Sequence, residues 1–461
     1  MIFDLVIVGA GPAGIFAALE AKKLDPGIQI LMLEKGKPIE KRICPKRITG
    51  ICVNCSPCHI TTGFAGGGAY SDGKLSLCPE VGGILPEYIG YEMTADLIRY
   101  VDEIYLSYGA DRQVYGLGHP EKTEHIRRKA IESNLKLIEC PIRHMGTEIS
   151  YEIYQKLQID LLARGVDIRF ETPVVDLVVD EHGVRGVVAD QVYLGKKVAV
   201  AVGREGSQWF QGICEKYQVK TTAGTVDIGV RVETRNEVMK ELNEIMYESK
   251  LIYYTPTFDD KVRTFCTNPG GEVVAEFYDD NLAVVNGHSY KAEERKTSNT
   301  NFALLVSKNF TEPFRSPIEY GKYIARLGNL LAGNKIMVQR YGDFRRGRRT
   351  TYERLCRNNI TPTLKDSVPG DLSLVLPYRI MKDIDEMIIA LDHITPGLAS
   401  AETLLYGVEV KFYSNKVSVN GNFETSIQNL HVLGDGAGIT RGLIQANCNG
   451  VYFARHLLGP H

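Results

Sequence analysis

The sequence contains no apolar run approaching the roughly 20 residues that a membrane-spanning helix requires. It also shows no basic stretch ahead of an apolar segment at its start, which is the pattern of a secretory signal. We therefore expect a cytoplasmic protein without a membrane span. In that compartment its ten cysteines are expected to stay reduced, so a cluster of them indicates metal or redox chemistry rather than a disulfide framework.

An excess of charge of one sign is also absent, since the formal net charge is −2 over 461 residues. This balance gives no overall attraction to nucleic acid, although a local patch could still act. The sequence has no internal repeat and no low-complexity segment. Its length suggests two domains, or one domain that carries an insertion. The composition thus favours an ordinary globular protein, and nothing in it points to a nucleic-acid partner.

The clearest motif is the glycine-rich turn of residues 9–14, Gly-Ala-Gly-Pro-Ala-Gly, between the apolar run 4–8 and a helix-forming segment. A second apolar run, 28–33, ends in Glu34, which lies 20 positions beyond Gly14. This order of strand, glycines, helix, strand and acidic residue is typical of a dinucleotide-binding βαβ unit. The helix N-terminus is expected to bind a diphosphate, and Glu34 the ribose hydroxyls.

Four cysteines follow this unit, with the spacing Cys52-x₂-Cys55-x₂-Cys58 and Cys44 upstream. Three thiolates from one turn and a fourth from elsewhere are typical of [4Fe–4S] sites, and Cys44 or Cys78 could be the fourth. Zinc would accept the same four thiolates. The third interpretation is a set of unliganded thiols near a cofactor. The predicted ligands are Cys44, Cys52, Cys55 and Cys58.

Later segments indicate further parts of the same site. The glycine-rich stretch 62–74 is expected to be a second loop in contact with the cofactor. An apolar run ends at Ala201-Val202-Gly203, and another ends at Gly434-Asp435 ahead of a helix that begins near Gly442. The composition changes after Thr225, and the block 226–394 reads as an inserted α+β domain. We predict a nucleotide-binding domain from 1–225 and 395–461, with 226–394 as a substrate-binding cap.

Two other features limit the choice of partners. No second complete glycine fingerprint occurs, so a dedicated NAD(P)H domain is not expected. Reductant would come from a transient NAD(P)H site or from a ferredoxin-like protein. The run Arg345-Arg346-Gly347-Arg348-Arg349 could bind phosphates or a carboxylate, and a solvated turn is an equal alternative.

The glycine turn with Glu34, the Ala201 to Gly203 strand end and Gly434-Asp435 together resemble the two-dinucleotide-binding-motif flavoproteins of the glutathione reductase superfamily. Further segments resemble the uncharacterised FAD-dependent dehydrogenase family, which is related to the bile-acid-reductase-like flavoproteins. These segments are 71–75, 203–206, 227–231, 394–397, 402–407 and 434–438.

The resemblance implies an α/β fold with a Rossmann-like FAD-binding domain of glutathione reductase type and an inserted α+β domain. It implies an FAD-dependent oxidoreductase that transfers hydride or electrons through flavin N5 to a small organic substrate. An RNA-modifying flavoenzyme and a non-catalytic FAD-binding redox sensor are the alternatives. The proton-donor candidates are His144, His393 and Tyr406. The expected cofactor-binding residues are Gly9, Ala10, Gly11, Pro12, Ala13, Gly14, Glu34, Lys35, Gly66, Gly67, Val174, Ala201, Gly203, Gly434, Asp435, Gly442, Leu443 and Ile444.

Overall fold

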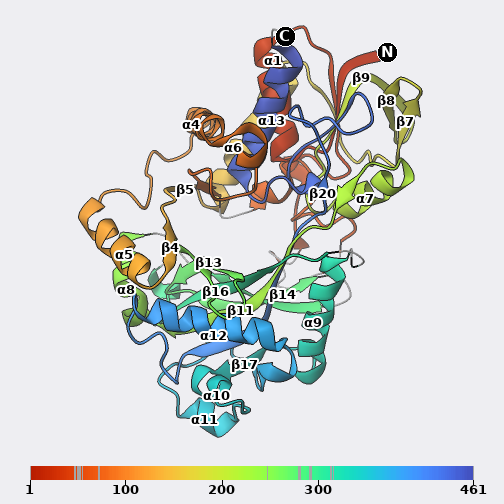
Figure 1. The fold of residues 1–461 in the computed structure, drawn as a ribbon. Helices are drawn as coiled ribbons and strands as arrows, with labels where there is room; N and C mark the ends of the chain where they lie inside the picture. The colour runs from red at the N-terminus through yellow and green to blue at the C-terminus, as the bar shows by residue number, and fades with distance from the viewer. Residues whose placement is uncertain are drawn as a thin grey trace. The chain divides into compact units, whose positions relative to one another are not determined.

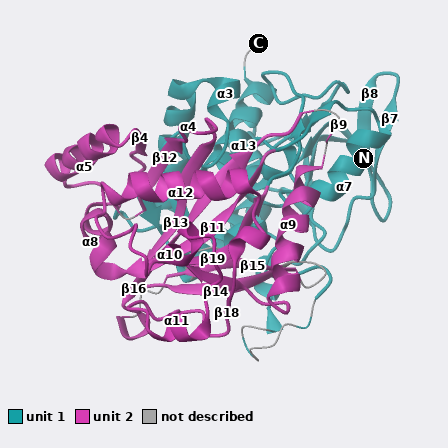
Figure 2. Cartoon of the chain, turned by 60° about the horizontal axis from the view of Figure 1, so that its bottom comes forward, with its two compact units in different colours: residues 1–114, 141–224, 413–461 teal, residues 115–140, 225–412 magenta. Residues whose placement is uncertain are grey.

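The computed structural model describes residues 2–45, 48, 53, 55–70, 73–246, 248–278, 282–289, 293–311, 314 and 316–459. The chain divides into two compact units, and each combines helices with β-sheet (Figures 1 and 2). Unit 1 contains residues 1–114, 141–224 and 413–461. Unit 2 contains residues 115–140 and 225–412. The expectation of a mixed α/β protein is therefore confirmed, and the structure contains several sheets.

Unit 1 is built on a seven-stranded sheet with the order β6-β2-β1-β9-β8-β7, and β21 pairs with β9 beyond this path. Strand β1 (Ile2–Val8) lies between β2 (Ile30–Leu33) and β9 (Val192–Val200), parallel to both. Its apolar side chains from Leu5 to Ile7 are fully buried, as expected for a central parallel strand covered on both faces. Strand β21 (Leu430–Val432) is parallel to the second half of β9. The carboxyl ends of β1, β9 and β21 therefore meet at one edge of the sheet.

Helices cover this sheet, and α1 packs against α13. The remaining elements of unit 1 are α1 (Pro12–Leu24), η1 (Ile39–Lys41), η2 (Gly66–Tyr70), β3 (Lys74–Ser76), α3 (Pro86–Ile89), α4 (Tyr91–Ser107), β5 (Ile142–His144), α6 (Thr147–Ala163), β6 (Asp167–Arg169), β7 (Asp176–Asp180), β8 (Gly183–Val188), α7 (Ser207–Lys216), β10 (Thr221–Thr222), β20 (Lys416–Val417), η6 (Asp435–Ala437) and α13 (Leu443–Leu458).

Unit 2 is built on an eight-stranded sheet with the order β18-β17-β19-β11-β16-β13-β12-β4. One face of its central strand β11 (Val226–Arg235) is apolar, and the alternate residues Asp227, Arg231 and Glu233 are buried on the other face. The other elements are α5 (Pro120–Glu132), β4 (Leu135–Ile138), α8 (Asn236–Ile245), β12 (Lys250–Tyr254), β13 (Lys261–Pro269), β14 (Glu272–Tyr278), β15 (Leu282–His288), η4 (Glu293–Arg295), β16 (Asn299–Lys308), α9 (Pro317–Leu331), β17 (Met337–Arg340), α10 (Tyr341–Arg345), α11 (Tyr352–Cys356), β18 (Val368–Pro369), η5 (Leu372–Leu374), α12 (Tyr378–Asp392) and β19 (Leu404–Phe412).

The end of unit 2 follows from the pairing of one strand. Residues 402–406 suggest a helix by sequence, but they lead into β19, which is hydrogen-bonded between β11 and β17. Because β19 is an interior strand of the sheet, unit 2 continues to Phe412, whereas the predicted insertion stops at residue 394. Unit 2 also takes residues 115–140 from the first part of the chain, because β4 pairs with β12.

None of the helices in the described part of the chain combines the length and hydrophobicity needed to span a bilayer.

The contact between α1 and α13 gives a stability prediction. A Cβ on Gly450 would lie 2.2 Å from the backbone oxygen of Ala13, so Gly450→Ala must push the two helices apart. Overpacking of this kind costs about 1–3 kcal/mol. We expect a lower midpoint of thermal unfolding by circular dichroism.

The matched control is Gly212→Ala in α7, where no described atom lies within 4 Å of the added Cβ. Alanine is favoured over glycine within a helix by about 1 kcal/mol, so this variant should be at least as stable as the native chain. Equal midpoints for the two variants would contradict the packing described here.

Candidate functional site

The glycine-rich turn connects β1 to α1 at the edge of the sheet where the parallel strands end. Gly9 has φ +99°, and its N–H donates to the Leu33 carbonyl at 2.8 Å. A Cβ on Gly9 would lie 2.7 Å from the Ala201 oxygen, and one on Gly14 would lie 2.4 Å from the Gly9 oxygen. The packing of the chain itself therefore requires glycine at positions 9 and 14.

Gly11 is different, because the chain does not require glycine there. The nearest described atom to an added Cβ is the Ala201 oxygen at 3.7 Å, an ordinary contact distance. Gly11 is the N-cap of α1 and has no side chain with which to cap the helix. The first-turn N–H groups have no partner inside the helix, and the positive end of the helix dipole lies there. Gly11 therefore leaves the helix N-terminus open to an anionic ligand.

Glu34 links three segments of the site through one buried carboxylate. Its Oε2 accepts from the Ala10 N–H at 2.9 Å, while Oε1 accepts from the N–H groups of Gly36 at 2.8 Å and Gly63 at 3.1 Å. An ionised carboxylate offers about four acceptor positions. Three are used within the chain, which leaves Glu34 about one for a ligand hydroxyl. The carboxylate of Glu34 thus holds the turn after β1 and the loop before η2 in place.

Arg42 holds the same loop from the other side, and the sequence analysis missed it. Its guanidinium is buried and donates to the carbonyls of His59 at 3.0 Å, Ile60 at 2.7 Å and Phe64 at 2.5 Å. Burial lowers the pKa of Arg42 from its ordinary value, and neighbouring groups that include Tyr70 and Glu34 oppose the shift. A single arginine between a proline and a cysteine-rich segment gives no pattern that sequence reasoning can detect.

The loop that Arg42 shapes lies against the glycine-rich turn. The N–H of Ala65 donates to the Ala10 carbonyl at 2.7 Å, and Gly66 follows with φ +51°. No described atom lies within 4 Å of a Cβ placed on Gly67. A Cβ on Gly68, in contrast, would lie 3.1 Å from both the Leu443 side chain and the Tyr154 hydroxyl. The loop thus connects the turn after β1 with the first turn of α13.

The C-terminal part of the site is built on the segment between β21 and α13. Gly434 has φ +75°, and its N–H donates to Asn449 Oδ1 at 2.7 Å. Asp435 Oδ1 accepts from the Thr440 hydroxyl at 2.6 Å, and its Oδ2 lies 3.4 Å from Arg204 Nε. Burial raises the pKa of Asp435, while Arg204 and Thr440 oppose this shift.

The start of α13 resembles that of α1. Its N-cap is Gly442, and Leu443 and Ile444 form its first turn. The first turns of both helices, whose residues are all described, contain no acidic side chain. Gln445 ties this helix to residues 79–85 by donating to the Pro79 and Val81 carbonyls at 2.8 and 3.0 Å.

The remaining predicted cofactor-binding residues also lie in unit 1. Ala201 follows β9, and its N–H donates to the Val8 carbonyl at 2.8 Å. Gly203 has φ +65° with no described atom within 4 Å of an added Cβ. Lys35 forms an ion pair with Glu205. Val174 is half-buried in the segment before β7, which contacts Glu34 through the Thr172 N–H.

The three proton-donor candidates lie in different surroundings. His144 ends β5 in unit 1 and pairs with Lys74 of β3. His393 is exposed after α12 in unit 2, where it lines a surface cavity of about 390 Å³ with Lys129 and Glu386 among others. Tyr406 is fully buried in β19. The roles of all three in proton transfer remain predictions.

Tyr406 already has a hydrogen-bond partner within unit 2. Its hydroxyl donates to Glu233 Oε2 at 2.5 Å, and Glu233 also accepts from the Thr363 hydroxyl at 2.6 Å and from Asn299 Nδ2 at 3.1 Å. Burial raises the pKa of both Glu233 and Tyr406. A phenol with a raised pKa is a weak acid, so this geometry favours a positioning role for Tyr406.

The predicted metal site is only partly described. Cys52 lies outside the described residues, and Cys44, Cys55 and Cys58 are described as free thiols. Among the described residues, no three histidine, cysteine, aspartate or glutamate side chains form a group that could hold a metal ion. Metal binding is therefore not supported, and ligation by these cysteines stays a prediction.

Comparison with known proteins connects unit 2 with flavin dependence. Residues 225–412 match a family model described as "FAD-dependent protein, C-terminal domain-like". These are the bounds of the longer segment of unit 2. An uncharacterised protein of Clostridium beijerinckii is 25% identical over 98% of this chain and 80% of its own length. The family match supports the prediction of an FAD-dependent oxidoreductase.

Solved structures align with this chain only at low identity and low TM-score. Glycine oxidase from Bacillus cereus aligns with a TM-score of 0.37 and 11% identity, covering 99% of this chain and 95% of its own. L-amino acid deaminase from Proteus vulgaris aligns with a TM-score of 0.39 and 12% identity, covering 100% and 94%. Similarity at this level assigns no substrate to the present chain.

The Arg42 contacts generate a prediction for Arg42→Met, which keeps an apolar stem of similar length but removes the donors. Each hydrogen bond from a charged donor contributes about 1.5–3 kcal/mol, and every 1.4 kcal/mol is tenfold in an equilibrium. We expect the amides of residues 59–66 to exchange hydrogen at least about tenfold faster, as measured by mass spectrometry. The exposed neighbour Lys41→Met is the control and should exchange as the native chain does. Unchanged protection in Arg42→Met would contradict the role assigned to the guanidinium.

Proposed function

We propose that this protein is an FAD-dependent oxidoreductase that acts on a small organic substrate. The observation that carries the proposal is the pair of helices α1 and α13, each beginning at a glycine N-cap. They follow β1 and β21, the two parallel neighbours of β9. Ligands of open α/β sheets bind outside the carboxyl ends of such strands. A long ligand with an anionic centre fits two helix N-termini at one sheet edge.

The residues of unit 1 fit FAD in three respects. Gly11 leaves space for a diphosphate at the start of α1, although nothing in the chain itself requires glycine there. Glu34 keeps about one acceptor position for a ribose hydroxyl. Asp435 is positioned by Thr440 to accept hydrogen bonds from hydroxyl groups of the ribityl part. This assignment corresponds to an FAD-binding domain of glutathione reductase type, which we include in the proposal.

FAD, when bound, supplies hydride or electron transfer at N5 of its isoalloxazine ring. The residues of the chain would hold the ring and adjust its charge. In this proposal the N–H groups of Leu443 and Ile444, at the positive end of α13, favour negative charge on the pyrimidine end of the ring. The open space beside Gly67 and Gly203 leaves room for the cofactor to approach the backbone.

Substrate selection belongs in this proposal to unit 2, which we regard as the substrate-binding cap. Two buried polar pairs, Arg231 with Glu409 and Glu233 with Tyr406, hold neighbouring strands of its sheet together. In this proposal the residues that select the substrate extend from that sheet. His144 and His393 remain the candidates for proton transfer. NAD(P)H or a ferredoxin-like protein would supply the electrons.

The proposal predicts that Glu34→Gln and Asp435→Asn weaken FAD binding while the fold is retained. Each variant loses acceptor capacity toward a hydroxyl or N–H group, which costs about 1.5–3 kcal/mol and corresponds to about one to two decades in Kd. The measurement is flavin fluorescence quenching on titration of FAD into the apoprotein. The control, Glu181→Gln, lies at an exposed position of unit 1 and should bind as the native chain does. FAD affinity that is equal in all four proteins would refute the assignment.

The alternative functions differ from this one in how the flavin behaves. A redox sensor would bind FAD, but neither NAD(P)H nor a reduced ferredoxin would reduce it in turnover. An RNA-modifying enzyme would require RNA for reoxidation of the flavin. Anaerobic reduction followed at the flavin absorption band, with and without added RNA, separates the three functions.

For the cysteine-rich segment we make a separate proposal: its cysteines would hold a [4Fe–4S] cluster, which would be a source of electrons for the flavin. Its support is the Cys52-x₂-Cys55-x₂-Cys58 spacing with Cys44 upstream. Protein purified without oxygen should then contain about four iron atoms and four acid-labile sulfides per chain. Cys55→Ser should lose both, whereas Cys356→Ser, an exposed cysteine of unit 2, should keep both. Stoichiometric zinc without sulfide, or no metal at all, would show that the cluster is absent.

A further inference from the structure

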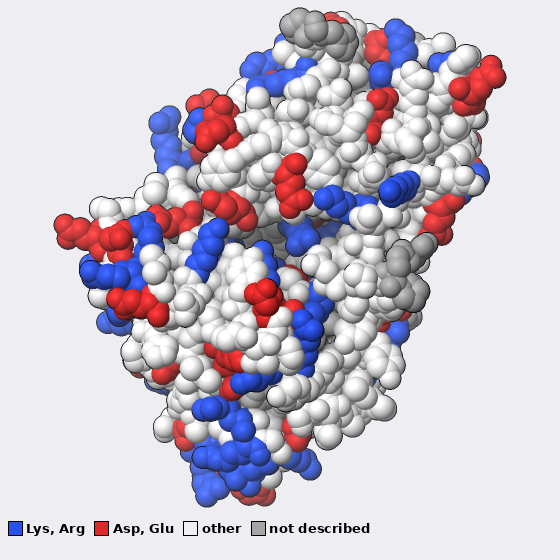
Figure 3. All heavy atoms as spheres, in the orientation of Figure 1, with Lys and Arg blue, Asp and Glu red and all other residues white. Residues whose placement is uncertain are grey.

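Unit 2 carries an arginine cluster that the proposed oxidoreductase chemistry does not use. It comprises Arg340, Arg345, Arg346, Arg348, Arg349, Arg354 and Arg357, around helices α10 and α11. Residues 340–357 contain no lysine and only two acids, Asp343 and Glu353, so this segment alone carries five positive charges in excess. Two carboxylates from outside the segment, Glu402 and Asp385, form ion pairs with Arg340 and Arg345. Figure 3 shows basic side chains gathered at the end of unit 2 that carries these helices. Because the whole chain has a net charge of −2, this concentration of positive charge is a local feature of unit 2.

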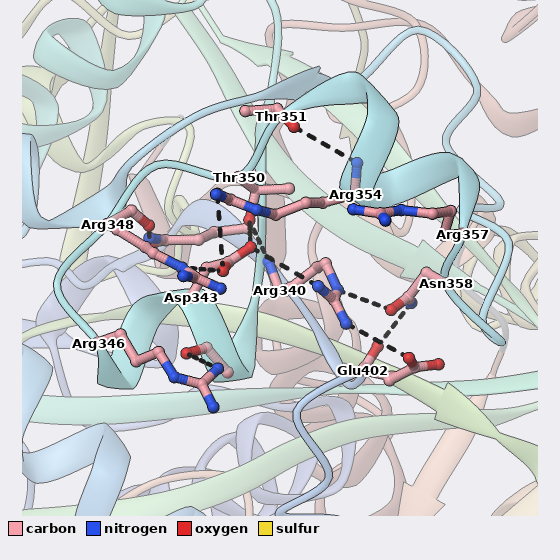
Figure 4. Close-up of polar contacts among 12 residues, drawn as sticks. Arg340, Asp343, Arg346, Arg348, Thr350, Thr351, Arg354, Arg357, Asn358 and Glu402 are labelled. Carbon is pink, nitrogen blue, oxygen red and sulfur yellow. Dashed lines mark hydrogen bonds and ion pairs between the residues drawn. The ribbon is translucent and has the colours of Figure 1, made fainter.

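One buried carboxylate organises the inner part of the cluster. Asp343 is fully buried, and its Oδ1 accepts from Arg348 Nε at 2.6 Å (Figure 4). Its Oδ2 accepts from the Thr350 hydroxyl at 2.9 Å. The guanidinium groups of Arg354 and Arg340 lie 3.9 and 4.0 Å from the same carboxylate. Burial alone would raise the pKa of Asp343, but Arg348 and Thr350 lower it, so the carboxylate stays ionised.

The outer part of the cluster is not neutralised in this way. Within the described part of the chain, Arg346, Arg349 and Arg357 form no ion pair with a carboxylate, and all three are exposed. Arg346 and Arg357 donate to the backbone carbonyls of Gly342 and Glu353. These contacts orient the two guanidinium groups without cancelling their charge, and each still has free donors.

The chemistry of the cluster favours phosphate groups on an extended ligand. Guanidinium forks match phosphate oxygens in bidentate geometry, and a cluster made of arginine alone uses that geometry. Neither of the two cavities described in unit 2 includes an arginine of the cluster, and Arg346, Arg349 and Arg357 are exposed at the surface. An extended polyanion can engage several exposed guanidinium groups at once.

An aromatic ring accompanies the arginines. Tyr352, at the start of α11, is 58% exposed and lies in the sequence between Arg349 and Arg354. Exposed aromatic rings beside basic groups are the stacking platforms of proteins that bind single-stranded nucleic acid.

We infer that the arginine cluster binds single-stranded nucleic acid, with the phosphates on Arg346, Arg349 and Arg357 and a base stacked on Tyr352. Asp343 holds the inner arginines in place and thereby sets the shape of the surface. This binding does not depend on FAD or on the proposed redox activity. It adds a partner that the net charge of the chain does not indicate.

The test is fluorescence anisotropy of a labelled 20-nucleotide poly-uridylate with the full chain, titrated at several salt concentrations. The variant Arg346→Ala/Arg349→Ala/Arg357→Ala removes only arginines without a carboxylate partner. Each phosphate contact contributes about −0.7 to the slope of log K against log salt for a single strand. We expect the slope to become shallower by about two and the affinity at 50 mM salt to fall at least tenfold.

The matched control is Arg99→Ala/Lys196→Ala/Lys240→Ala, which removes the same charge from exposed positions elsewhere and should keep the native slope. Tyr352→Ala should weaken binding without changing the slope, whereas the exposed Tyr323→Ala should have no effect. Circular dichroism confirms folding of each variant.

Four results would overturn the inference. They are no binding to the native chain at low salt, equal loss in the cluster and control variants, no effect of Tyr352→Ala, and competition by poly-glutamate as effective as by unlabelled poly-uridylate. The last would identify an acidic polypeptide as the ligand instead.

Discussion

The carboxylate of Glu34 is the interaction on which the rest of the site depends. It accepts three backbone N–H groups from the turn after β1, the segment after β2 and the loop before η2. Without it these donors would be buried and unsatisfied, which costs about 1–3 kcal/mol each. Arg42 completes the arrangement, because its guanidinium satisfies the carbonyls of the same loop. One buried anion and one buried cation thus shape backbone that has little regular structure of its own.

The glycines of unit 1 divide into two kinds by the space around them. Gly9 and Gly14 are required because backbone atoms of the chain occupy the space of a side chain. Gly11 and Gly67 have no such neighbour, and the space in front of them is available to a ligand. If these glycines served packing alone, positions 11 and 67 could hold a larger residue. The open positions lie beside the uncapped N-terminus of α1, where an anion is favoured.

The sequence was sufficient for the elements with strong local patterns. The βαβ unit of residues 4–34, the strands that end before Gly203 and Gly434, and the helix that begins near Gly442 follow from apolar runs and glycine signals. The helix that residues 402–406 suggest by sequence was wrong. These residues lead into β19, whose pairing inside a sheet overrides their local preference. Strand β16 and helix α12 did not stand out in the sequence. The attachment of residues 115–140 to unit 2 depends on a pairing between strands more than 100 residues apart, which local patterns do not encode.

Sequence reasoning selects candidate site residues where a residue type has one dominant use, as for the glycines and Glu34, and their part in cofactor binding stays a prediction. It does not select residues whose role comes from burial and neighbours, as for Arg42, Asp343 and the Glu233–Tyr406 pair. The central claim is that unit 1 binds one FAD. Native mass spectrometry of the full chain tests it most directly. The account predicts one FAD bound per chain, either retained through purification or gained on adding FAD. A chain that stays at its apoprotein mass in excess FAD would contradict it.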